Sequence, residues 1–199
     1  MRSPNPIRRL RRGCVWLLVA NFAAACPALA APKPAQLTAT FKDRDAPMAA
    51  RGTPSRCTVN FAEIVDERRS PETLGVVERR AVRAPTDVQA WMRAVLGGLT
   101  ARGVNVQFDA PAAPGARSAR FTLQTAWIQS TPVTYSASVV VRLQVEGSAD
   151  SAIDRSYRGR VARTTYWSGG VGTLQSAVDG AFADALDLIA EDLKILCAA

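Results

Sequence analysis

The stretch TYSASVVVRLQV, residues 134–145, alternates apolar and polar side chains along its whole length. Successive side chains of a β-strand point to opposite faces of the sheet, so this alternation predicts a strand with one buried and one polar face. The apolar positions are Tyr135, Ala137, Val139, Val141, Leu143 and Val145. The fold therefore contains a sheet that needs apolar cover on one side only.

Two further strands are predicted beside this one. The turn residues of 130–132 and 147–150 favour antiparallel hairpins at both of its ends. The apolar face of the preceding strand is predicted to carry Phe121, Leu123 and Trp127. The apolar face of the following strand is predicted to carry Ile153, Tyr157 and Val161. The three strands are expected to form an antiparallel meander.

Two amphipathic helices are predicted to cover the apolar face. The first begins after an N-cap at Thr86 and ends at Gly103. Its apolar residues at helical spacing are Val88, Trp91, Met92, Val95, Leu96 and Leu99. The second helix spans residues 173–196. Its apolar stripe consists of Leu174, Val178, Ala181, Phe182, Ala185, Ile189 and Leu196.

Strands predicted at 56–64 and 104–108 flank the first helix. A strand–helix–strand unit of this kind is expected to be a right-handed parallel crossover. The predicted element order is β-α-β-β-β-β-α. The predicted fold class is α+β, a two-layer sandwich with a mostly antiparallel sheet and two helices on one face.

Residues 1–30 have the layout of a secretory signal peptide. A basic start without acidic residues precedes the apolar run 14–25, which is too short to span a bilayer. Two processing routes stay open. Cleavage after Ala30 would use the small residues of 28–30, whereas the AAAC sequence ending at Cys26 is a weak match to a lipidation site. We expect export, with the protein either free in the periplasm or anchored to the outer membrane through Cys26.

The mature chain is predicted to have two parts. Residues 31–55 are rich in proline, alanine and small polar residues, which is typical of a flexible tether, with one short strand around Leu37–Phe41. Residues 56–199 are predicted to form a single α+β domain, since about 150 residues suffice for one hydrophobic core.

The charge of the mature chain argues against nucleic acid as a partner. The full sequence carries a net charge of +8, but five arginines and no acidic residue lie within residues 1–30. Removing these five from the 25 basic residues leaves 20 basic against 17 acidic residues, a net charge of +3. The electrostatic footprint of nucleic-acid binding has to belong to the folded domain, so we predict no nucleic-acid partner.

The chain contains no histidine, which excludes Ser-His-Asp and Cys-His catalysis and every histidine metal site. Of its four cysteines, two lie within residues 1–30 and two are 140 residues apart, which is not a zinc-binding spacing. We therefore predict no catalytic residues, no metal and no cofactor. Cys57 and Cys197 are instead candidates for a disulfide in an oxidising compartment, with two buried free thiols as the alternative.

The segment EIVDERRSPETLG, residues 63–75, gathers five charged side chains within 66–72, directly after a predicted strand. Asp66 and Glu67 could serve as a catalytic carboxylate pair, but adjacent residues of an extended chain point to opposite sides. The structural interpretation has Asp66 ending the strand, Arg68 pairing locally and the residues up to Gly75 turning the chain. We favour structure or recognition, and we take Asp66 and Arg68 as candidate binding residues.

The polar face of the meander is the second candidate binding surface. It is predicted to display Thr122, Gln124, Ser136, Ser138, Arg142, Gln144, Ser156, Arg158 and Arg160. Arginines on an exposed sheet can hold carboxylates or phosphates with two parallel hydrogen bonds. Arg142, Arg158 and Arg160 are therefore binding candidates, and the alternative is a solvated or edge-protecting charged strand.

The chain resembles YajG-type bacterial lipoproteins. The resemblance lies in the element order, in D-x-R…P-x-x-L-G (Asp66 to Gly75), in LTARGVNV (99–106) and in the segment 131–147. The R-S-Y-R-G run (155–159) and the alanine-rich last helix also fit, and a more distant likeness is to auxiliary lipoproteins of envelope ABC transporters. The resemblance implies a Gram-negative envelope protein, often lipid-anchored, with no catalytic residues to carry over.

The expected function is that of a non-enzymatic envelope protein, an accessory or binding module for a protein, lipid or glycan partner. Its only contact with a membrane would be a lipid anchor at Cys26. Two alternatives stay open: a glycan-directed hydrolase that uses Asp66 and Glu67, and a purely structural envelope lipoprotein without a ligand.

Overall fold

The structure, a computed structural model, describes residues 32–43, 57–109, 115–131, 133–146, 152–164 and 170–198. The predicted signal peptide and the lipidation candidate Cys26 lie outside these residues. The elements, in chain order, are β1 (Ala35–Gln36), β2 (Thr58–Asp66), β3 (Thr73–Val77), β4 (Arg80–Arg83), α1 (Val88–Ala101), β5 (Asn105–Phe108), β6 (Arg117–Thr131), β7 (Thr134–Val145), β8 (Ile153–Thr164) and α2 (Val171–Ala198).

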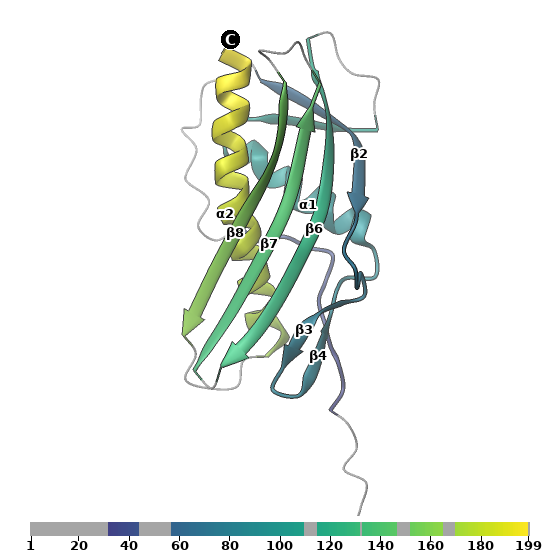
Figure 1. The fold of residues 1–199 in the computed structure, drawn as a ribbon, viewed down its shortest axis with the longest axis vertical. Coiled ribbons are helices and arrows are strands. Elements are labelled where there is room, and N and C mark those ends of the chain that lie inside the picture. Colours follow the sequence, from purple (N-terminus) through teal and green to yellow (C-terminus); the bar gives the residue numbers. More distant parts are fainter. Residues whose placement is uncertain are drawn as a thin grey trace, which may run out of the picture. The chain divides into compact units, whose positions relative to one another are not determined.

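The long strand β6 organises the sheet (Figure 1). One of its edges pairs antiparallel with β7, which pairs antiparallel with β8, so the predicted meander is confirmed. Its other edge is shared by two strands that run parallel to it. β2 occupies the first part, up to Asp66 opposite Leu123, and β3 the later part, with Gly75 opposite Ile128. The segment 67–72 therefore interrupts what would otherwise be one continuous neighbour of β6.

The remaining strands extend this second side. β5 pairs in parallel with β2, which confirms the parallel pairing expected for the strands on either side of the first helix. β4 pairs antiparallel with β3, and β1 pairs in parallel with β4. The α+β class is confirmed, but the mostly antiparallel two-layer sandwich is not. The sheet is mixed and curled, with parallel pairs that involve β1, β2, β3 and β5, and β1, β3 and β4 are strands that the predicted order lacks.

Both helices lie on the same side of the sheet, as predicted (Figure 1). The N-cap of α1 is Asp87 rather than the predicted Thr86, because the Asp87 carboxylate accepts a hydrogen bond from the Ala90 N–H at 2.8 Å. Gly103, with φ at +84°, follows the helix in the left-handed conformation that glycine tolerates best. The residues of α1 that enter the core are Trp91, Met92, Val95, Leu96 and Leu99, all of them predicted.

α2 packs very closely on β8. A Cβ atom placed on Gly159 would lie 1.8 Å from the carbonyl oxygen of Ala181 and 2.8 Å from the Ala185 nitrogen. Only glycine lets the strand and helix backbones approach in this way. The Arg160 N–H then donates to the Asp184 carboxylate at 2.8 Å, so α2 also satisfies a main-chain group on the outer edge of β8.

The predicted tether is wrong for residues 32–43, which belong to the folded domain. Ala35 and Leu37 are both almost fully buried in the core. The observed strand β1 lies at Ala35–Gln36 rather than at 37–41. Burial of apolar side chains outweighs the cost of ordering this proline- and alanine-rich segment. Residues 44–56 lie outside the described part of the chain.

Arg102 holds the end of this segment against the helices. Its side chain is only 3% exposed and forms ion pairs with Asp43 and, at 2.6 Å, with Asp187 on α2. It also donates to the carbonyl oxygens of Gly98 and Ala183. A buried guanidinium needs this many partners, because an unpaired buried charge is very costly.

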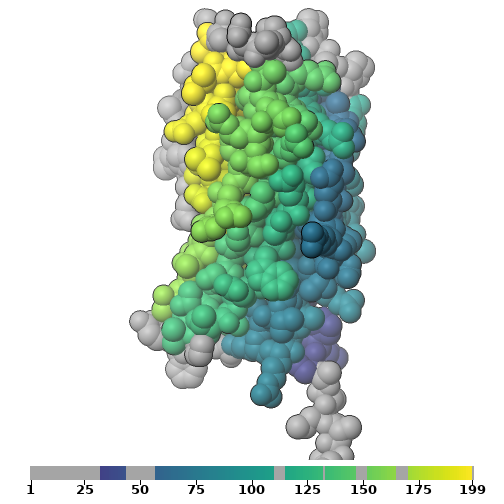
Figure 2. All heavy atoms as spheres, in the orientation of Figure 1, coloured from purple at the N-terminus to yellow at the C-terminus, as the bar shows by residue number. Residues whose placement is uncertain are grey.

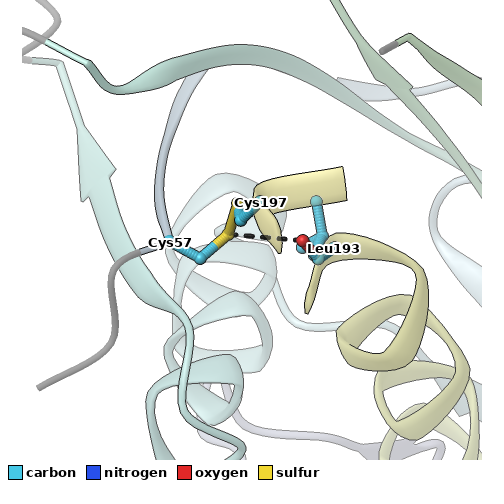
Figure 3. Close-up of a disulfide and its surroundings, with 3 residues drawn as sticks. All are labelled: Cys57, Leu193 and Cys197. Carbon is cyan, nitrogen blue, oxygen red and sulfur yellow. Dashed lines mark hydrogen bonds between the residues drawn. A yellow bond between two sulfur atoms is a disulfide. The ribbon is translucent and has the colours of Figure 1, made fainter. Parts of the chain in front are cut away.

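Cys57 and Cys197 form a disulfide with 5.3 Å between their Cα atoms (Figure 3). It joins the residue before β2 to the last turn of α2, across 140 residues of sequence. Figure 3 shows the Cys57 sulfur facing the Leu193 carbonyl oxygen, at 3.5 Å. Of the two alternatives that the sequence leaves open for these cysteines, the structure therefore shows the disulfide.

Candidate functional site

The face of β6, β7 and β8 that points away from the helices is turned toward the viewer in Figure 2. We call it the open face. Along the whole length of β7, buried residues alternate with half-buried ones, so the two faces of this strand are those predicted from the sequence. Apart from Thr122, which is buried, the polar residues predicted for this face are half-buried or exposed. This surface is therefore formed by the side chains of regular strands.

Trp127 lies on the open face and not on the apolar face where the sequence places it. The pairing of β6 with β7 shifts by one residue between Leu123 and Thr125, so a β-bulge interrupts the alternation. One extra residue turns every later side chain to the other face. Ala126 and Ile128 consequently enter the core, and the Trp127 side chain is left 48% exposed.

Trp127 forms a wall between two hollows. The first, which we call the β8 hollow, has a volume of about 380 Å³ and extends over Ser136, Ser138 and Arg160. The second, the loop hollow, has a volume of about 350 Å³ and lies between Trp127 and the segment 67–73. The open face thus offers an aromatic ring with a recess on each side, and polar side chains contribute to the lining of both recesses.

Of the predicted arginines, Arg142 is engaged within the sheet. Its Nε and Nη2 each donate to an oxygen of Asp154 at 2.7 Å, and Gln144 donates to the same carboxylate at 3.2 Å. The hydrogen bond from Arg142 lowers the pKa of Asp154, and the one to Asp154 raises the pKa of Arg142. Asp154 was not singled out from the sequence, because its partner is 12 residues away on the neighbouring strand.

Arg158 and Arg160 are exposed on β8 and form no ion pair with another described residue. Their neighbour Arg155 differs, since it pairs with Asp192 of α2 at 2.6 Å. Tyr157 donates to the same carboxylate at 2.7 Å, and burial followed by this hydrogen bond raises the pKa of Tyr157. The cations available to a ligand on this strand are therefore Arg158 and Arg160.

Arg68 is buried, although it belongs to a charged loop. Its side chain is 3% exposed, with Nε and Nη2 bonded to the two oxygens of Asp66 and Nη2 also donating to the Pro71 carbonyl at 2.6 Å. The pair of binding candidates Asp66 and Arg68 therefore fixes the loop to itself. Arg68 still lines the loop hollow, and its Nη1 is buried without a hydrogen-bond partner.

No group of three or more histidine, cysteine, aspartate or glutamate side chains in the described ranges could hold a metal ion. Among the same residues, no helix combines the length and the apolarity needed to cross a bilayer.

No protein-family model and no curated protein matches this chain. Among solved structures, it is similar to a crystal structure of a Xanthomonas campestris protein of the DUF330 family, with 12% identity and a TM-score of 0.39 over 82% of this chain and 91% of that one. It is also similar to the crystal structure of a minor lipoprotein from Acinetobacter baumannii, with 14% identity and a TM-score of 0.32 over 70% of this chain and 93% of that one. Likeness at this level assigns neither family nor role, and the YajG-type resemblance stays a prediction.

Proposed function

We propose that this protein is a non-enzymatic binding module of the bacterial cell envelope and that it captures its partner on the open face. The observation that carries the proposal is the half-exposed Trp127 between two hollows of an otherwise polar sheet surface. Single exposed apolar residues are ordinary, but an indole ring flanked by recesses is the kind of group that dominates binding energy at interfaces.

The positive charges near Trp127 also support the open face as the binding surface. Arg158 and Arg160 border it and have no ion-pair partner among the described residues, so they are available to a carboxylate or phosphate. Arg142 is less suited, because Asp154 already occupies its two donors.

The geometry of the loop supports a role without catalysis. Both oxygens of Asp66 accept hydrogen bonds from Arg68, so this carboxylate is poorly placed to give or take a proton. Glu67 would have to act without a second group, and the chain has no histidine to help it. We therefore propose recognition rather than hydrolysis for the segment 63–75.

Export rests on the sequence of residues 1–30, and mass spectrometry of the mature N-terminus tests it. We expect either a chain that begins at Ala31 or one that begins at a lipid-modified Cys26. An intact N-terminal segment in fractionated cells would contradict the envelope assignment.

Binding is tested by placing a photo-crosslinking amino acid at Ser138, on the open face, in living cells. The matched control is the same residue at Glu191, which is exposed on α2 behind the sheet. We expect a discrete adduct from position 138 alone. Adducts of equal yield from both positions, or from neither, would count against the open face as a binding surface.

Charge reversal gives an independent measurement. The double variant Arg158→Glu/Arg160→Glu should lower the yield of the adduct. The control Arg80→Glu/Arg83→Glu makes the same change of charge on β4, which pairs only with β1 and β3. Equal yields from the two variants would show that the arginines of β8 take no part.

A further inference from the structure

The loop hollow has a mixed lining that narrows the chemistry of its occupant. The Trp127 indole forms one wall, and hydroxyl, amide and charged groups surround it. These polar residues are Glu67, Arg68, Arg69, Ser70, Thr73, Gln124 and Thr125. A guest therefore has to offer one apolar surface and several polar groups within the size of a single ring or two.

Arg68 lines this hollow and has one hydrogen-bond donor without an acceptor. Its Nη1 is buried and has no partner, while Nε and Nη2 are fully used by Asp66 and Pro71. A buried donor without an acceptor destabilises the folded protein, and more so when it carries a charge. An oxygen of a guest that reached Nη1 would relieve this destabilisation. Because Nη1 is covered, a guest oxygen can reach it only if the side chains that cover it move aside.

The position of the hollow disfavours peptides and acyl chains. Extended peptides are commonly held by main-chain hydrogen bonds to a free strand edge, but here β6 lacks a paired neighbour only over the short stretch between Leu123 and Ile128, which the segment 67–73 borders. An acyl chain would need a continuous apolar lining, whereas Trp127 and Ala126 are the only apolar residues among the described residues that line this hollow. A sugar ring, with an apolar C–H face and a polar edge, matches the lining.

We propose that the loop hollow binds a saccharide, with the C–H face of a sugar ring on the Trp127 indole and a hydroxyl or carboxylate oxygen accepting from Nη1 of Arg68. The inference deepens the proposed function, on which it rests, by naming the class of ligand. Envelope saccharides have two sources, the glycan strands of peptidoglycan and the core oligosaccharide of lipopolysaccharide, and the experiment tests each separately.

The experiment titrates the mature protein with the N-acetylglucosamine–N-acetylmuramic acid disaccharide, or with lipid-free core oligosaccharide, and follows indole N–H resonances. Residues 31–199 contain three tryptophans, so three signals are expected, and Trp127→Phe assigns the relevant one. We expect this signal to shift in a saturable way with one of the two sugars, with a Kd of about 1 mM or below.

Variants locate the sugar. Trp127→Ala should abolish binding, and Ser70→Ala and Gln124→Ala should each weaken it several-fold. The control Arg80→Ala, on β4 and outside the lining of both hollows, should leave the Kd unchanged. All four positions are at least partly exposed, so circular dichroism should show folded proteins. Arg68→Lys keeps the positive charge but loses the forked arrangement of guanidinium donors. The binding free energy for the sugar should therefore fall by more than the free energy of unfolding.

Two results would overturn the proposal. One is no shift of the Trp127 signal with either sugar at concentrations well above about 1 mM. The other is full binding in both Ser70→Ala and Gln124→Ala, which would place the sugar outside the loop hollow. In either case a crosslinked adduct from Ser138 would leave the proposed binding function standing, so the two failures are distinguishable.

Discussion

Arg68 holds the carboxylate of Asp66, two residues earlier, through two hydrogen bonds of 2.8 and 2.7 Å. The pair stands where β2 leaves β6, and the donation from Arg68 to the Pro71 carbonyl closes the turn that brings the chain back as β3. A segment that looks catalytic in sequence is thus the joint that lets two strands share one edge of a third.

Asp66→Ala should destabilise the domain by about 3 kcal/mol, because it leaves the Arg68 guanidinium buried without its counter-charge. Urea unfolding followed by circular dichroism measures this effect. The neighbouring exposed substitution Glu67→Ala is the control and should change stability by less than about 0.5 kcal/mol. Equal, small effects at both positions would show that the pair does not fix the loop.

Gly159→Ala should be among the most damaging single substitutions. The added methyl group would meet the main chain of α2, which cannot move aside as a side chain can, so we expect a loss of more than about 3 kcal/mol or no folded protein. Thermal unfolding and the yield of soluble protein report the outcome.

Gly97→Ala is the matched control for this substitution. Gly97 is exposed on α1 and nothing lies within 4 Å of an added Cβ, so alanine should stabilise the helix by about 0.5–1 kcal/mol. Opposite signs for the two glycines are expected. A stable Gly159→Ala protein would mean that α2 does not approach β8 as closely as described.

Loss of the disulfide should lower stability substantially. The bond closes a loop of 140 residues, for which the chain-entropy model gives about 5 kcal/mol as an upper figure. The double variant Cys57→Ser/Cys197→Ser and the reduced wild-type protein should therefore unfold at similar, lower urea concentrations. A double variant as stable as the oxidised protein would contradict this role.

The pair of Arg142 and Asp154 should add a small acid-dependent contribution to stability. Because the pKa of Asp154 is lowered in the folded state, the contribution is present above the unfolded value of about 3.9 and is lost as pH falls through the folded pKa. Both side chains are well exposed, so solvent screens the effect.

Unfolding midpoints of wild type and Asp154→Asn between neutral pH and pH 3 measure this contribution. The difference between the two proteins should be largest near neutral pH and should shrink on acidification. A difference that does not depend on pH would show that the carboxylate acts through packing and not through its charge.

Regular periodicity made much of the fold predictable from the sequence. The alternation of 134–145 correctly gave β7 and its two faces, and helical spacing gave the buried residues of α1. The hairpin of β3 and β4 was missed because its turn uses Glu78 and Arg79 at positive φ, without the glycine or asparagine that normally marks such a turn.

The candidate site was harder to predict. The bulge that exposes Trp127 arises from pairing with β7, and the residue types at 123–125 do not predict it. Alternation without that bulge places the indole in the core, so the central aromatic of the open face was lost. Arg68 was singled out for the right reason, its charge, but whether it faces solvent depends on how Pro71 closes the loop.

The covalent bond between Cys57 and Cys197 also sets how the domain bears mechanical load. It encloses every described strand and helix except β1 within one closed ring of chain. Tension applied from the N-terminal side would detach residues 32–43 and then reach Cys57, where the sulfur bridge carries the force directly to the end of α2. The sheet that bears Trp127 lies outside that line of force and would keep its shape while the molecule is pulled.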